Sequence, residues 1–229
     1  MNREPVFERP SGWMHAGYLA TVVSLDDPDH ANRVQVRLIA FDDVDKQDAP
    51  MWARVVAPFA GKDRGVFFLP EVDDEVLVVF MNGDARFPII LGGLWNGNAS
   101  SPADIQSGGT NRYKRIKSKN GIVITLDDQQ GQETLKLETP GGQKITLQDG
   151  PGSILVEDSN GNSVKLESAG ITVTASAKVK VQAAQVEVSA GMVKVDAAMS
   201  KFSGMVKCDV LQTNSVISTS YTPGAGNIW

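Results

Sequence analysis

Three consecutive seven-residue repeats decide the fold of this chain: Lys178-Val-Lys-Val-Gln-Ala-Ala184, Gln185-Val-Glu-Val-Ser-Ala-Gly191 and Met192-Val-Lys-Val-Asp-Ala-Ala198. Two shorter copies follow at 199–204 and 205–210. A coiled coil also has a seven-residue period, but its apolar residues are three and four apart, whereas these valines are two apart. Val also favours strands over helices. The repeats therefore predict short β-strands.

One such strand with a turn of two or three residues cannot close a cross-section on itself, so a single chain has no way to bury the valines. Three identical chains that each donate one strand per layer would give a layer of about 21 residues with three faces, closed by a cyclic interface. We predict an intertwined trimeric β-helix over 115–215. Cys208 takes a valine position there as a small buried hydrophobe, with an interchain link or a redox role as the alternative. The expected trimer core is Val179, Val181, Val186, Val188, Val193, Val195, Phe202 and Cys208.

The same spacing of two continues upstream of the repeats in a looser form. Turn-forming residues separate the pairs, at 127–128, 140–142, 149–152 and 160–162, and Gly, Pro, Asn and Asp are the usual residues of such turns. The apolar pairs are Ile122/Ile124, Leu135/Leu137, Ile145/Leu147, Ile154/Val156, Val164/Leu166 and Ile171/Val173.

Composition divides the chain into two unlike halves. Residues 1–105 carry a net charge of -7 and 106–229 a net charge of +2, and eleven of the fifteen aromatic residues precede residue 106. No aromatic residue lies between 114 and 201, and an ordinary globular core uses large rings to fill its volume. The predicted organisation is an N-terminal extension at 1–14, a domain at 15–100, a linker at 101–114, the shaft at 115–215 and a terminal segment at 216–229.

The first half is predicted to be a small all-β barrel. Strand signals bounded by turn formers recur at 18–25, 33–39, 51–58, 75–81 and 87–91, which is the strand number of an OB-type barrel. Asn82-Gly83-Asp84 is a strong hairpin signal. The net charge of this half would repel phosphate, so we expect no nucleic-acid partner.

Several residues of this barrel resemble a known family. Trp52-Ala-Arg-Val55, Ala57-Pro-Phe-Ala-Gly61, Leu69-Pro-Glu-Val-Asp-Asp-Glu-Val76 and Leu94-Trp-Asn-Gly97 resemble the OB domain of phage baseplate assembly protein V and of VgrG spikes. Asp73 departs from the family, which usually has Gly there, so a differently shaped turn is expected.

The resemblance implies a structural central spike of a contractile phage tail or phage-tail-like injection system. It further implies a homotrimer, a trimeric hub protein at the OB end, a PAAR-type tip protein at the C-terminal end, and the target cell envelope as the surface met on firing. Tyr221, Pro223, Ile228 and Trp229 would form an apolar platform for the tip protein, although the same tail could simply fold back and cap the shaft. No signal peptide is recognised, so we expect synthesis in the cytoplasm and assembly into a particle's baseplate.

Signals for chemistry are weak. His15 and His30 stand alone in the sequence, and neither a catalytic zinc motif nor a Gly-x-Ser-x-Gly elbow occurs, so we expect no enzyme, metal or cofactor. The acidic cluster Glu71, Asp73, Asp74 and Glu75 reads as a solvated turn or as a cation site, and the basic run 112–119 as a solvated face or an acidic partner's contact. Rival functions are a trimeric tail fibre that binds glycans and an envelope-degrading enzyme; the lack of aromatic rings between 114 and 201 argues against the tail fibre.

Overall fold

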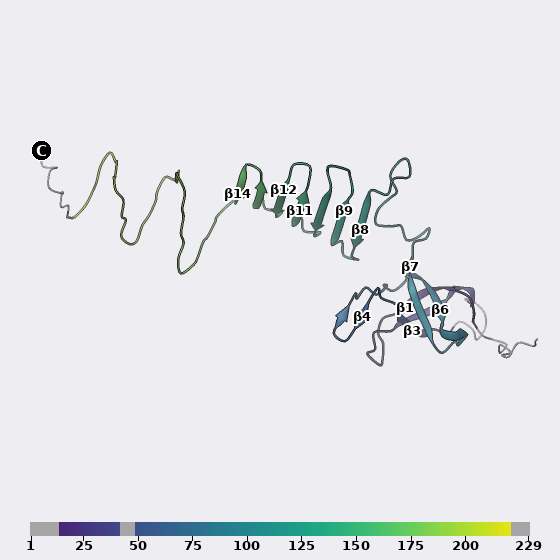
Figure 1. Ribbon diagram of the computed structural model, residues 1–229. Helices are drawn as coiled ribbons and strands as arrows, with labels where there is room; N and C mark the ends of the chain where they lie inside the picture. Colours follow the sequence, from purple (N-terminus) through teal and green to yellow (C-terminus); the bar gives the residue numbers. More distant parts are fainter. Residues whose placement is uncertain (1–13, 42–48, 221–229) are drawn as a thin grey trace, which may run out of the picture. The chain divides into compact units, whose positions relative to one another are not determined.

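The computed structural model describes residues 14–41 and 49–220. In these ranges the chain is almost entirely β-structure, as predicted, with two single-turn 3-10 helices (Figure 1). The elements are β1 (Tyr18–Ser24), β2 (Val34–Leu38), η1 (Ile39–Phe41), β3 (Met51–Val55), β4 (Ala60–Gly61), β5 (Arg64–Gly65), β6 (Glu75–Phe80), η2 (Met81–Gly83), β7 (Pro88–Leu94), β8 (Tyr113–Lys117), β9 (Val123–Asp127), β10 (Thr134–Glu138), β11 (Lys144–Gln148), β12 (Ser153–Glu157), β13 (Ser163–Glu167) and β14 (Gly170–Thr174).

The predicted five-stranded barrel is confirmed. Its strands follow the order β1-β2-β3-β7-β6, and the barrel closes because β6 pairs with β1. The pair β3–β7 is parallel and every other pair is antiparallel. Burial alternates along β2 and β6, so one face of each strand fills the interior. The fully buried side chains with the largest volumes are Val22, Val34, Val36, Val76, Val78 and Ile90, each of which contributes about 1.5–3 kcal/mol by leaving water.

The turn between β1 and β2 is organised by one buried carboxylate. Asp27 accepts hydrogen bonds from the backbone N–H groups of Asp29, Ala31 and Arg33, and the Arg33 guanidinium lies 2.6 Å from it. The Arg33 side chain, helped by these N–H donors, lowers the pKa of Asp27 well below its usual range. The predicted Asn82-Gly83 turn also forms, with positive φ at both residues, as that dipeptide favours.

Asp73 keeps the backbone conformation for which the family's glycine is suited. Its φ is +74°, a left-handed value that Gly adopts freely and Asp tolerates. Asp73 N–H donates to Val22 O and Val22 N–H to Asp74 O, so this loop is held against β1. The turn at Asp73 therefore has a positive φ that Gly would adopt freely, and a difference in shape from the family's turn stays a prediction.

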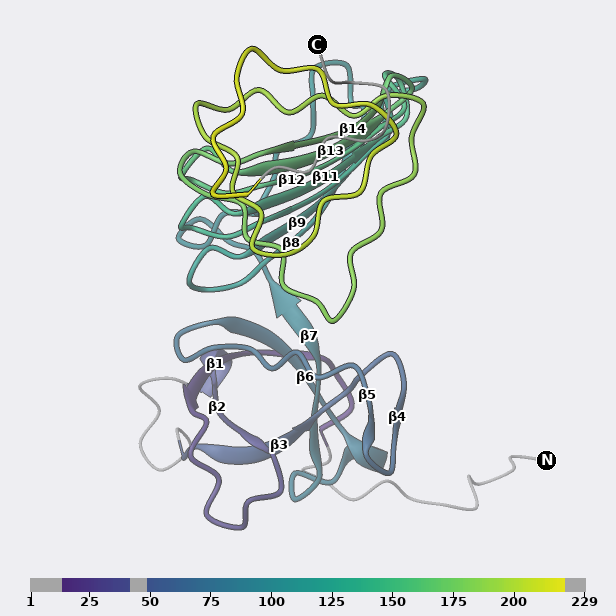
Figure 2. The same cartoon turned by 90° about the vertical axis from the view of Figure 1, so that its left-hand side faces the viewer.

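Strands β8 to β14 form one antiparallel sheet in which each strand pairs with its neighbours in the chain (Figure 2). The predicted turns lie between these strands; Gly142 and Gly161, for example, have φ of +87° and +82°, which a non-glycine residue adopts only at a cost. Over 113–174 the ladder partners thus lie within the same chain, whereas the sequence predicted an intertwined β-helix from residue 115 onward.

The described segment after β14 has no regular secondary structure, unlike the sheet before it. Residues 175–220 contain no strand and run as an extended zigzag trace (Figure 1). The valine pairs of the first two repeats are separated by Gln182-Ala183-Ala184-Gln185, which lacks the Gly or Asn that a two-residue hairpin turn favours. An in-chain hairpin is therefore disfavoured where the seven-residue period begins.

Candidate assembly surfaces

The sheet β8–β14 has an apolar face made of two columns of side chains. Paired residues bring Leu137 opposite Ile145 and Leu135 opposite Leu147, and the match continues across every later strand. All but Ile124 are at least 36% exposed in the single chain, an area of the kind that marks an interface. The columns are Ile116, Ile124, Leu137, Ile145, Val156, Val164 and Val173, and Leu126, Leu135, Leu147, Ile154, Leu166 and Ile171.

The opposite face of the same sheet is polar and pairs its charges internally. Lys144 Nζ lies 3.5 Å from Glu157 on the neighbouring strand. Lys136 pairs with Glu138 at 2.8 Å, and Lys165 with Glu167 at 2.6 Å. Each of these ion pairs contributes only modestly to the stability of the sheet. The polar face is satisfied in contact with water, so the apolar face is the one that would gain from packing against another surface.

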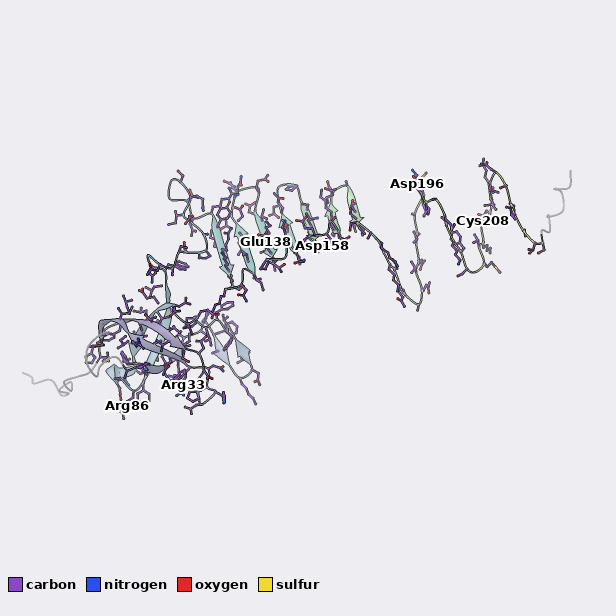
Figure 3. All side chains as sticks on the ribbon, turned by 180° about the vertical axis from the view of Figure 1, so that it is seen from behind. Arg33, Arg86, Glu138, Asp158, Asp196 and Cys208 are labelled. Atoms are coloured by element: carbon purple, nitrogen blue, oxygen red, sulfur yellow. The ribbon has the colours of Figure 1, made fainter. Side chains whose placement is uncertain are left out.

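The predicted trimer-core residues beyond β14 are not brought together within one chain. The six valines are 62% to 71% exposed, Phe202 is 73% exposed and Cys208 is an exposed free cysteine. Figure 3 labels Cys208 and Asp196 on this strand-free segment. Tyr221, Pro223, Ile228 and Trp229, the predicted tip platform, lie outside the described residues.

Three cations of the basic run 112–119, at Arg112, Lys114 and Lys119, have carboxylate partners within the chain. Arg112 bridges to Asp127, Lys114 bridges to Asp128, and the Arg112 guanidinium lies 5.0 Å from the centre of the Tyr113 ring. The Asp127 side chain raises the pKa of Arg112. These cations are therefore used to secure β8 and β9.

The carboxylates of the acidic cluster Glu71, Asp73, Asp74 and Glu75 lie in a loop, and three of them have hydrogen-bond or ion-pair partners within the chain. Asp74 accepts a hydrogen bond from the Glu71 backbone N–H at 2.8 Å, Glu71 pairs with Lys119 at 2.8 Å, and Glu75 accepts from Asn96 at 2.7 Å. The Glu71 carboxylate raises the pKa of Lys119. Within 14–41 and 49–220 no three His, Cys, Asp or Glu side chains gather as metal ligands. His30 lies in the β1–β2 turn at a φ of +51°.

The barrel also has a groove that was not predicted from the sequence. It has a volume of about 630 Å³ and is lined by the β1–β2 loop, the end of β3, the β4–β5 hairpin and residues 66–69. Arg54, Arg64, Phe67 and Phe68 contribute to its lining. The available signal was the pair Phe67-Phe68, three residues after Arg64, in a stretch without strand alternation.

Two family models match this chain over complementary parts. Residues 18–95 match the Type VI secretion system/phage-baseplate injector OB domain, and residues 134–199 match the phage baseplate V C-terminal trimerisation domain. The first match coincides with the barrel, and the second begins at β10 and extends through the three regular repeats.

The chain belongs to the VgrG-like baseplate spike family. It is 27% identical over 113 residues to the Type VI secretion system spike protein VgrG1c of Pseudomonas aeruginosa, which covers 47% of this chain and 16% of that protein. It is 32% identical over 89 residues to the spike protein VgrG3 of Vibrio cholerae, covering 38% and 9%. The similarity to the actin cross-linking toxin VgrG1 of Vibrio cholerae is 29% over 94 residues, covering 40% and 9%.

Membership of this spike family supports a structural role, and the trimerisation-domain match supports a homotrimer. The matched region spans only 9% to 16% of the length of these three relatives. In the described ranges, no helix has the length and apolar character needed to cross a membrane.

Proposed function

We propose that this protein is the central spike of a contractile phage tail or phage-tail-like injection system, and that it acts mechanically, with no catalytic step of its own. The observation that carries the proposal is the two-column apolar face of the β8–β14 sheet, which one chain leaves exposed. Its strands β10 to β14 lie in the region that matches a trimerisation domain, and the sheet follows a barrel that matches an injector OB domain.

In the proposed trimer, three copies of the apolar face pack around a threefold axis. The aliphatic columns would form a dry core and the charged face would meet water. Beyond β14, the seven-residue repeats would continue as an intertwined β-helix, in which Val179, Val181, Val186, Val188 and their equivalents face the axis. Every strand would then pair with a neighbour, which gives a shaft with few open edges and slow unfolding.

The two ends of the spike have distinct proposed partners. The OB barrels dock on a trimeric hub protein of the tail, and the segment 216–229 carries a PAAR-type tip protein through Tyr221, Pro223, Ile228 and Trp229. Sheath contraction would drive the shaft toward the target envelope. Family membership supports these roles, and each is open to a separate test.

Sedimentation equilibrium of the purified chain tests the trimer. We expect a mass near three times 24.6 kDa. A folded species of 24.6 kDa at micromolar concentration would refute the proposed spike.

Pull-down with a PAAR-type protein tests the tip separately. The full chain should retain it, whereas a chain that ends at Ser220 should lose it while remaining a trimer. Retention by the shortened chain would reject the terminal segment as the docking site.

A further inference from the structure

The barrel groove has a chemistry that differs from the rest of its domain. Arg54 and Arg64 line it, and Asp63 is the lining's one carboxylate, so the groove is cationic on a half-chain of net charge -7. Within the described residues neither arginine has an ion pair, while Arg33 and Arg86 each hold a carboxylate.

Exposed aromatic side chains lie beside these cations. Phe67 and Phe68, in the lining, are 67% and 71% exposed, and Phe59, at the base of the β4–β5 hairpin, is 59% exposed. Exposed rings next to arginines are typical of binding surfaces, because both residue types supply much of the energy at interfaces. A volume of about 630 Å³ is within the usual range of ligand sites.

We infer that this groove binds a short acidic peptide segment with an aromatic or aliphatic anchor, supplied by a different protein of the baseplate. The inference rests on the proposed spike function. Carboxylates of the segment would pair with Arg54 and Arg64, which can each form two parallel hydrogen bonds to one carboxylate. The anchor would pack on Phe67 and Phe68.

Charge argues for a different protein as the source of this segment. Many carboxylates on the barrel of this chain already have partners: Asp29 pairs with Arg33, Asp84 with Arg86 and Glu71 with Lys119, while Glu75 accepts from Asn96. A second copy could offer these groups only by breaking contacts of its own.

A defined pair of peptides tests the groove on the full-length chain. The first is a fluorescein-labelled octapeptide with a central Phe-Leu flanked by Asp and Glu, and the second replaces every acid by Lys. We expect fluorescence anisotropy to show saturable binding of the acidic peptide, with an affinity at least about tenfold higher than that of the basic peptide. Equal affinity for the two peptides, or no saturable binding of the acidic one, would overturn the inference.

Matched variants assign the binding to this surface. R54E combined with R64E should weaken binding at least about tenfold, and Phe67→Ser with Phe68→Ser should do the same. Lys62→Glu is the control, because Lys62 lies on the same hairpin but outside the lining and should change affinity less than about twofold. An equal loss in the control, or unchanged binding in R54E/R64E, contradicts the proposal.

Sedimentation of the same variants separates this inference from the spike function. The groove variants should keep the mass of the unsubstituted chain. A change of mass in R54E/R64E would make the groove a contact between copies and overturn the inference, while the trimer itself would stand. A monomer for the unsubstituted chain would instead reject the proposed function.

Discussion

Substitution of Val188 by Asp is the sharpest test of the shaft. In the single chain Val188 is 70% exposed, and full burial of a valine side chain contributes about 1.5–3 kcal/mol. Burial of the remaining 70% in the trimer would contribute about 1–2 kcal/mol per chain, or about 3–6 kcal/mol for three copies. Val188→Asp loses this term and also places three carboxylates near one axis, where an unpaired charge is costly.

Limited trypsin digestion followed by mass spectrometry reads out the effect. The shaft offers cleavage sites at Lys180, Lys194 and Lys201, which a closed β-helix would protect. We expect Val188→Asp to be cut rapidly at these sites and Val188→Ala at an intermediate rate.

Glu187→Ala is the matched control, since residue 187 alternates in direction with Val188 and would face water. It should be cut as slowly as the unsubstituted shaft. If Glu187→Ala opened the shaft while Val188→Asp left it protected, the assignment of inward and outward positions would be reversed and the valine core refuted.

Three further predictions concern the described domains. Ile90→Ala, at a fully buried position, should lower the barrel's free energy of unfolding by about 2–5 kcal/mol in urea titration followed by tryptophan fluorescence, with the oligomeric mass unchanged. Gly142→Ala should cost about 1–2 kcal/mol in thermal unfolding of the shaft, because φ there is +87° and the new methyl would lie 3.1 Å from the Ser159 Cβ; no change would mean that the turn relaxes. Hydrogen bonds from Asn162 lower the pKa of Asp158 from 3.8 to about 2, so this carboxylate stabilises the fold above pH 4 and loses that contribution as the pH falls toward 2; Asp158→Asn should flatten this part of the stability profile, and an unaltered profile would contradict the assignment.

Much of the barrel could be predicted because its strands carry local signals. The expected strand at 18–25 is β1, and the one at 75–81 is β6, each within a residue at either end. The β4–β5 ladder was missed since Ala60-Gly61 and Arg64-Gly65 have no alternation of apolar and polar side chains. With it the groove was missed, because the hairpin forms one of its walls.

In the shaft, the periodicity of apolar residues predicts which side chains share a face of a strand but not which strand pairs with it. Spacing of two places Leu135 with Leu137 on one face of their strand, and Ile145 with Leu147 on one face of theirs, whatever strand lies beside them. The pairing register puts both pairs on the same face of the sheet. The spacing contains no information on whether the neighbouring strand belongs to the same chain. The five-residue connection 139–143, with Gly142 at positive φ, allows β10 and β11 to pair within the chain.

By itself, the sequence determined the all-β class, the contrast between an acidic first half and a shaft with no aromatic residue between 114 and 201, and which apolar side chains share a face of their own strand, because a strand alternates with a period of two along its own length. Only the tertiary structure decided which strands pair within one chain. It also brings Arg54 and Arg64, ten residues apart in the sequence, into the lining of the same groove. The strand pairing and the groove both depend on the direction that the chain takes after each turn. That direction is set by backbone dihedrals and by packing between segments distant in the sequence.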